Sequence, residues 1–207
     1  GAVRSADHWS LIPDGHRACP TDVRALESWP DGSIRWALVD AQIQSSDPLS
    51  AGVLQTDGPA SAGGPAITLA ERGTGVEVST GVAVFVFAAR GRMPFEQVTV
   101  DGVPMLAATG GGLTVTGEDG AAADVLVDRC VVEQRGRLRV VVRLDGVAAV
   151  GGRSLQVTTR VECFAGLGVV RVLCTLRNPD AARHPGNFWD LGDPGSVLLE
   201  DVAVTFR

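Results

Sequence analysis

The sequence predicts an all-β protein made of two consecutive units, the second of which is a sandwich of antiparallel sheets. Short runs of alternating apolar and polar residues recur along the chain, and turn-forming pairs such as Thr80-Gly81 and Asp101-Gly102 separate them. The 207 residues include 26 glycines, and β-branched residues are abundant. No stretch shows a sustained apolar period of about 3.6 residues, which would indicate an amphipathic helix.

The first unit extends from Leu11 to Gln44 as short strands interrupted by turns. The segment from Asp22 to Glu27 could also begin a helix capped by Thr21. A sheet fits better, because apolar residues alternate in this segment and after it, at Val23, Ala25, Ile34, Trp36 and Leu38. Residues 45–65 are rich in Ser, Gly, Pro, Ala and Asp, so we expect a connection there and a domain boundary near residue 65.

The hairpin around Gly166-Leu167 allows its register to be predicted, because a two-residue loop fixes which residues face each other. The expected apolar face joins four pairs: Val157 with Leu176, Thr159 with Cys174, Val161 with Val172, and Cys163 with Val170. Glu162 then faces Arg171 on the other side, as a favourable cross-strand pair. Cys163 and Cys174 would lie roughly 13 Å apart along the strands, which is too far for a disulfide.

Charge and composition exclude several classes of function. A net charge of -6 argues against a nucleic-acid partner, which requires a concentrated basic face. The longest apolar stretch, residues 81–89, is about half the ~20 residues of a spanning helix, so we expect a buried strand and no membrane partner. All 18 basic residues are arginines and tyrosine is absent, so two common catalytic side chains are missing. The four cysteines have no Cys-x-x-Cys spacing, which favours isolated thiols over zinc.

No cofactor is expected from the sequence. A nucleophile elbow, a phosphate-binding glycine loop and a dinucleotide fingerprint are all missing. Gly166-Leu167-Gly168 precedes a strand and is typical of a turn.

The stretch from His184 to Ser196 is the strongest candidate for a functional loop. It combines turn formers with two Asp, an Asn, a His, a Trp and a Phe, so it cannot continue a helix or a sheet ladder. Two apparent strands flank it. Surface loops held by such strands often carry function.

Two motifs resemble a known family. Trp29-Pro30-Asp31-Gly32-Ser33-Ile34-Arg35-Trp36-Ala37-Leu38-Val39-Asp40 resembles a signature in the first domain of exo-rhamnogalacturonan-lyase-like proteins. Asn187-Phe188-Trp189-Asp190-Leu191-Gly192-Asp193-Pro194-Gly195-Ser196 resembles a signature in their second domain. Their order and separation also match, and the resemblance covers essentially the whole chain. The start, Gly1-Ala2-Val3, departs from the opening strand of family members.

The resemblance implies a small N-terminal β-barrel of the RIFT type over residues 1–65, lacking its first strand, and a central β-sandwich over residues 66–207. In the family an α/α toroid follows and cleaves pectin-type uronate polysaccharides by β-elimination. We therefore expect this chain to be the non-catalytic β portion of such a bacterial, secreted protein, located outside the cell or in the periplasm. Its expected partners are a polysaccharide or oligosaccharide and the toroid, and a freestanding carbohydrate-binding or structural module is the alternative.

Elimination at a uronate needs a base, an acid and a group that neutralises the carboxylate. In this chain His184 is the candidate base, and Arg183 could face the sugar carboxylate. A sugar-binding role fits the loop better, with four candidate residues: Asn187, Trp189, Asp190 and Asp193. The alternative is that these side chains only stabilise the loop or dock another domain. Two carboxylates are too few for calcium, so no metal is expected.

The first motif is expected to be structural. Asp31-Gly32 is typical of a hairpin turn, and Trp36 alternates with Ile34 and Leu38 toward a core. Arg35 is expected to lie over Trp29 or to pair with Asp31.

Overall fold

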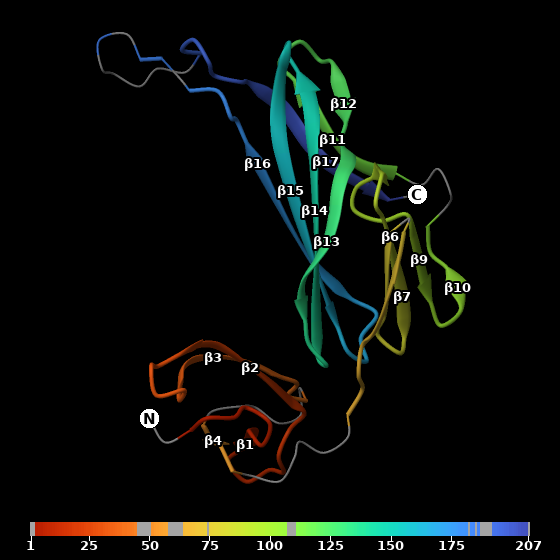
Figure 1. Ribbon diagram of the computed structural model, residues 1–207. Helices are drawn as coiled ribbons and strands as arrows, with labels where there is room; N and C mark the ends of the chain where they lie inside the picture. The colour runs from red at the N-terminus through yellow and green to blue at the C-terminus, as the bar shows by residue number, and fades with distance from the viewer. Residues whose placement is uncertain are drawn as a thin grey trace.

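The computed structural model describes residues 3–44, 51–57, 64–73, 75–106, 111–181, 183–184, 186 and 192–206. Within these residues every named element is a β-strand, and every strand pairing is antiparallel (Figure 1). The predicted all-β class with antiparallel sheets is confirmed.

The first part of the chain forms two separate two-stranded sheets. In one, β1 (Ser10–Pro13) pairs with β4 (Gly52–Gln55), and in the other β2 (Thr21–Ser28) pairs with β3 (Ile34–Ala41). The segment from Asp22 to Glu27 is thus a strand, as its alternation predicted. No ladder joins the two sheets among the described residues, so the small barrel stays a prediction.

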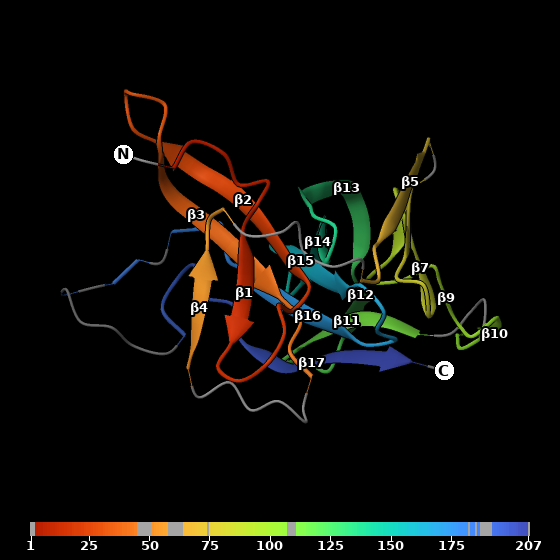
Figure 2. The ribbon, with the colours of Figure 1, turned by 90° about the horizontal axis from the view of Figure 1, so that it is seen from below.

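Three sheets form the rest of the molecule, as Figures 1 and 2 show. The long sheet has the order β16-β15-β14-β13-β8, with β8 (Gly91–Arg92), β13 (Leu126–Arg135), β14 (Arg139–Val150), β15 (Arg153–Phe164) and β16 (Val170–Arg177). A second sheet has the order β10-β9-β7-β6-β5, with β5 (Thr68–Arg72), β6 (Gly75–Ser79), β7 (Ala83–Ala88), β9 (Gln97–Val100) and β10 (Val103–Pro104). The third has the order β12-β11-β17, with β11 (Gly111–Gly117), β12 (Ala122–Asp124) and β17 (Leu199–Phe206).

Apolar side chains from all three sheets meet in one core between the layers. The largest of the fully buried ones include Phe87, Met93, Leu113 and Leu144. Because both neighbouring sheets contact β13 or β14, the long sheet is the layer on which the other two pack. A leucine truncated to alanine in such a core costs about 2–5 kcal/mol of unfolding free energy.

The register of the hairpin β15–β16 is the predicted one. All four expected pairs occur, and Glu162 faces Arg171. The β15 half of the apolar face is buried, including Val161 and Cys163, but Val172 and Cys174 on β16 are exposed. The pairing was therefore predictable from the turn, whereas the exposure of β16 was not. The four cysteines are free thiols, of which Cys19 and Cys163 are buried and Cys174 is exposed.

Two turns that the sequence predicted lie against each other at one end of the sandwich. The Thr80 hydroxyl donates to the Leu167 carbonyl at 2.7 Å and accepts from the Ala83 amide at 3.0 Å. The Gly166 amide donates to the Thr80 carbonyl at 2.7 Å. Thr80 is fully buried, and these bonds satisfy its polar atoms.

The first part of the chain contacts the sandwich through carboxylates at the β13–β14 turn. Asp22 Oδ2 accepts from the Arg137 amide at 2.6 Å, and Asp40 Oδ1 lies 2.8 Å from Arg139 Nε. The buried Arg139 Nε has no hydrogen-bond partner, so its contact with Asp40 is an ion pair that lacks hydrogen-bond geometry. Gln42 adds a bond from Nε2 to the Ala165 carbonyl at 2.6 Å.

The expectation that Trp36 points into a core is wrong. Its side chain is 61% exposed, so no described part of the chain covers that side of β3. The other expectations for this motif are confirmed in part. Asp31-Gly32 is the hairpin turn, with Gly32 in the left-handed region at φ 81°. The Arg35 guanidinium carbon lies 4.5 Å from the centroid of the Trp29 ring, and Arg35 pairs with Glu27 rather than Asp31.

The cysteines should differ widely in reactivity. Burial raises the pKa of Cys163 to about 12 and that of Cys130 to about 11, so neither thiol is ionised near pH 8. Burial raises the pKa of Cys174 as well, but this residue is exposed and Cys163 is buried. Cys174 should therefore react with iodoacetamide before Cys163, as followed by mass spectrometry of each peptide. In guanidinium chloride the two rates should converge. Equal rates for Cys163 and Cys174 in the native protein would contradict this structure of the hairpin.

Candidate functional site

A histidine and an aspartate meet in the segment between β16 and β17. His184 Nδ1 lies 2.6 Å from Asp193 Oδ2, and the two side chains are 21% and 10% exposed. An ionised carboxylate can only accept, so Nδ1 donates in this contact and the imidazole plane is fixed. The sequence singled out both residues but did not predict that they pair.

Backbone bonds hold the two sides of this segment together. The Arg183 amide donates to the Pro194 carbonyl at 2.8 Å, directly beside the pair. Asn178 Nδ2 donates to the Gly195 carbonyl at 2.7 Å, which ties the residue after β16 to the residues before β17. Gly192 and Gly195 have φ values of 89° and 99°, a region that disfavours residues with a Cβ. The sequence therefore places glycine where this turn needs it.

An open pocket lies next to the pair. Its lining includes Arg153, Asp180, Arg183 and Pro194. Arg153 is occupied by Asp180, with Nη1 at 2.8 Å from Oδ2. The Arg183 side chain is exposed and has neither a hydrogen bond nor an ion pair within the described residues. The pocket therefore presents one uncommitted guanidinium, and the next residue in the chain is the histidine held by Asp193.

The arrangement can bind an anion or transfer a proton. A guanidinium fork matches the two oxygens of a carboxylate, and an imidazole held by an aspartate can donate or accept a proton. Of the residues predicted for this loop, the structure brings together Arg183, His184 and Asp193. Asn187, Trp189 and Asp190 lie outside the described residues, so their expected roles stay predictions.

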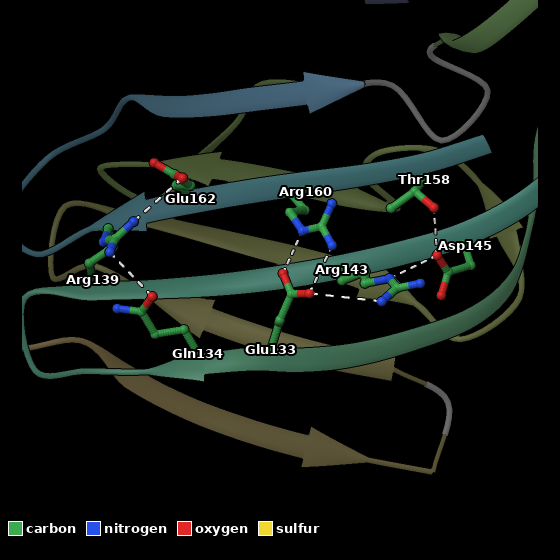
Figure 3. A network of polar contacts seen from close by, with 8 residues as sticks. All are labelled: Glu133, Gln134, Arg139, Arg143, Asp145, Thr158, Arg160 and Glu162. Carbon is green, nitrogen blue, oxygen red and sulfur yellow. Dashed lines mark hydrogen bonds and ion pairs between the residues drawn. The ribbon is translucent and has the colours of Figure 1, made fainter. Parts of the chain in front are cut away.

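A polar network on the outer face of the long sheet was missed from the sequence (Figure 3). Arg160 makes two bonds to the Glu133 carboxylate, at 2.6 and 2.9 Å. Arg143 Nε lies 2.9 Å from Asp145 Oδ1, and Asp145 also accepts from the Thr158 hydroxyl at 2.8 Å.

The same face continues toward the β13–β14 turn. There Arg139 lies within 3.5 Å of Glu162 and donates to Gln134 at 3.2 Å. Register arithmetic of the kind applied to β15–β16 would have found only the pair Asp145 and Thr158, which face each other on neighbouring strands. Glu133 and Arg160 lie two strands apart, on β13 and β15. Each of these charges already has a partner, so the network is a stabilising surface and a weaker candidate for a ligand site than the pocket.

Comparison with family models and with curated proteins finds no relative of this chain. No family model matches this chain, and no curated protein shows a significant similarity to it. Among the described residues no helix is long and apolar enough to span a membrane. In that same part of the chain no group of three or more His, Cys, Asp or Glu residues could hold a metal ion.

Glu133 gives the network a testable pH dependence. The Arg160 hydrogen bonds lower the pKa of Glu133 below its ordinary value of 4.5. The ionised Glu133 carboxylate therefore contributes its full stabilisation above pH 4.5. This stabilisation is lost as the pH falls through the lower pKa that Glu133 has in the folded state. Glu133→Gln should reduce the unfolding free energy at pH 7 by up to about 1 kcal/mol, since the pair is partly exposed.

Urea denaturation of the wild type and Glu133→Gln between pH 7 and pH 3 measures this effect, and the difference should shrink on the acid side. Glu118→Gln is the matched control, because Glu118 is exposed and has no partner within the described residues. If the difference in unfolding free energy between the wild type and Glu133→Gln stays constant with pH, the charge of Glu133 plays no part in stability.

Proposed function

We propose that this chain is the non-catalytic β portion of a polysaccharide-lyase-like protein and binds uronate-containing saccharides of the rhamnogalacturonan type at the loop between β16 and β17. The observation that carries the proposal is the uncommitted Arg183 guanidinium on an open pocket, one residue before the His184 that Asp193 holds. The two sequence motifs that resemble the exo-rhamnogalacturonan-lyase-like family support the choice of substrate class.

A uronate is distinguished from a neutral sugar by its C6 carboxylate, and the pocket supplies what that group requires. Arg183 offers a planar set of donors, and His184 adds a donor whose orientation Asp193 fixes. The net charge of -6 repels polyanions at long range, so binding depends on this local arrangement. Trp189, Asn187 and Asp190 are proposed to complete the subsite against the sugar ring and its hydroxyl groups.

Elimination needs both a base and an acid. The carboxylate that lines the pocket, Asp180, is paired with Arg153, which favours a binding role for this chain. A toroid domain of the same protein is proposed to supply the remaining groups. A freestanding binding module would use the same loop in the same manner.

Isothermal titration with oligogalacturonides and rhamnogalacturonan fragments tests the proposal. Arg183→Ala should weaken binding about 10- to 100-fold, the value of a charge-assisted hydrogen bond of about 1.5–3 kcal/mol. Arg24→Ala is the matched control, since Arg24 is an exposed arginine on β2 without a partner in the described residues. It should bind like the wild type.

Oligosaccharides of the same length whose carboxylates have been reduced are neutral, and they should bind weakly to every variant. A flat titration of the wild-type chain, or equal losses for Arg183→Ala and Arg24→Ala, would leave a structural module as the better account.

A further inference from the structure

The sandwich has an open side where two strands end their sheets. β16 is the last strand of the long sheet, and β17 is the last strand of the sheet β12-β11-β17. Figure 2 shows both at the same side of the two layers. Each pairs with only one neighbour among the described strands, so the outer backbone groups of both remain unpaired in the ladders.

Apolar side chains that point between the layers reach solvent at this side. Val202 and Val204 on β17 face the same way as their buried partners on β11, Val115 and Leu113. They are nevertheless 41% and 39% exposed. On β16, Val172 is 37% exposed although it faces the same way as its fully buried partner on β15. Edges of this kind, long and apolar, are usually covered in native proteins.

The charges on the two edge strands are complementary. β16 carries Arg171 and Arg177 and no acidic residue, while β17 carries Glu200 and Asp201 and no basic residue. Arg177, Glu200 and Asp201 have no partner within the described residues. Pairing two copies through β16 alone would gather arginines, and pairing them through β17 alone would gather carboxylates. Only a mixed pairing brings opposite charges together.

We propose that the open side binds a second copy of this chain, with β16 of each copy pairing with β17 of the other. Each strand has eight residues, and the chain runs out along β16 and returns along β17 (Figure 1). A two-fold axis parallel to the strands exchanges the two layers, so β16 of one copy lies beside β17 of the other. The rotation keeps the direction of each strand, and the two strands are therefore antiparallel.

Both edges of both copies are used at once, so the assembly closes as a dimer instead of extending as a filament. If Val172 faces the second copy's Val204 in this pairing, Arg177 lies opposite its Leu199, and Asp201 is the diagonal neighbour of Arg177. Two continuous sheets and one shared apolar layer result. The dimer does not depend on the saccharide site, which lies at the ends of these strands.

Analytical ultracentrifugation of the full chain tests the proposal. The wild type should sediment as a concentration-dependent dimer. Val172→Glu and Val204→Glu should each weaken dimerisation at least about a hundredfold, because each places an unpaired carboxylate in the shared apolar layer. Val103→Glu is the matched control, since Val103 is an exposed valine on β10 in another sheet. It should leave the dimer unchanged.

Exchanging the charges of Arg177 and Asp201 gives a second test. A variant that simply fails to fold would not regain dimerisation when the second substitution is added. Arg177→Glu should weaken the dimer up to about tenfold, and the double variant Arg177→Glu with Asp201→Arg should restore it. A wild type that remains monomeric up to about 1 mM, a weak limit for a specific complex, overturns the proposal. It is also overturned if only one of Val172→Glu and Val204→Glu disrupts the dimer, because a mixed pairing needs both strands.

Discussion

The hairpin of β14 and β15 is the constraint on which the rest of the structure depends. Each strand has twelve residues, and their side chains alternate between a buried face and a charged face. The inner face, with Leu144, Val157 and Val161, supplies the layer on which the other sheets pack. Since the side-chain period of a strand is two, a slip of one residue would bury Arg143 and Arg160 and expose this core. The register of the hairpin is thus strongly specified from both faces.

The attachment of the first part of the chain is of a different physical kind. It is mainly polar, because Asp22 accepts from the amides of Arg137 and Leu138 at the β13–β14 turn, and Asp40 pairs with Arg139. Amides at a tight turn lack ladder partners, and a carboxylate from another part of the chain satisfies them. Such contacts fix orientation through directed bonds, while the burial of apolar surface stabilises the sandwich itself.

Local sequence patterns predict much of the fold, but they do not predict the environment of every residue. Alternation and turn chemistry predicted the strand at Asp22 to Glu27 and the exact pairing of Val161 with Val172. Alternation does not reveal whether a second layer covers the apolar face, and for this reason Trp36 was expected to be buried. The pairing of His184 with Asp193 was equally hidden, since no predicted strand register fixes the distance between two positions nine apart in the sequence. Candidate residue types can be recognised in a loop, but their geometry depends on bonds such as the one from Asn178 to Gly195.

The candidate saccharide site owes its precision to the same two strands that leave the sandwich open. Asn178 directly follows β16, and its bond to the Gly195 carbonyl reaches the segment that leads into β17. The Arg183 amide and the Pro194 carbonyl close the same loop a few residues further on. The positions of Arg183 and His184 therefore follow from where β16 ends in one layer and β17 begins in the other. The His184 ring is already held by Asp193 and therefore loses little conformational entropy on binding a carboxylate. For Arg183 only the backbone is held in advance, so its exposed side chain still loses entropy on binding.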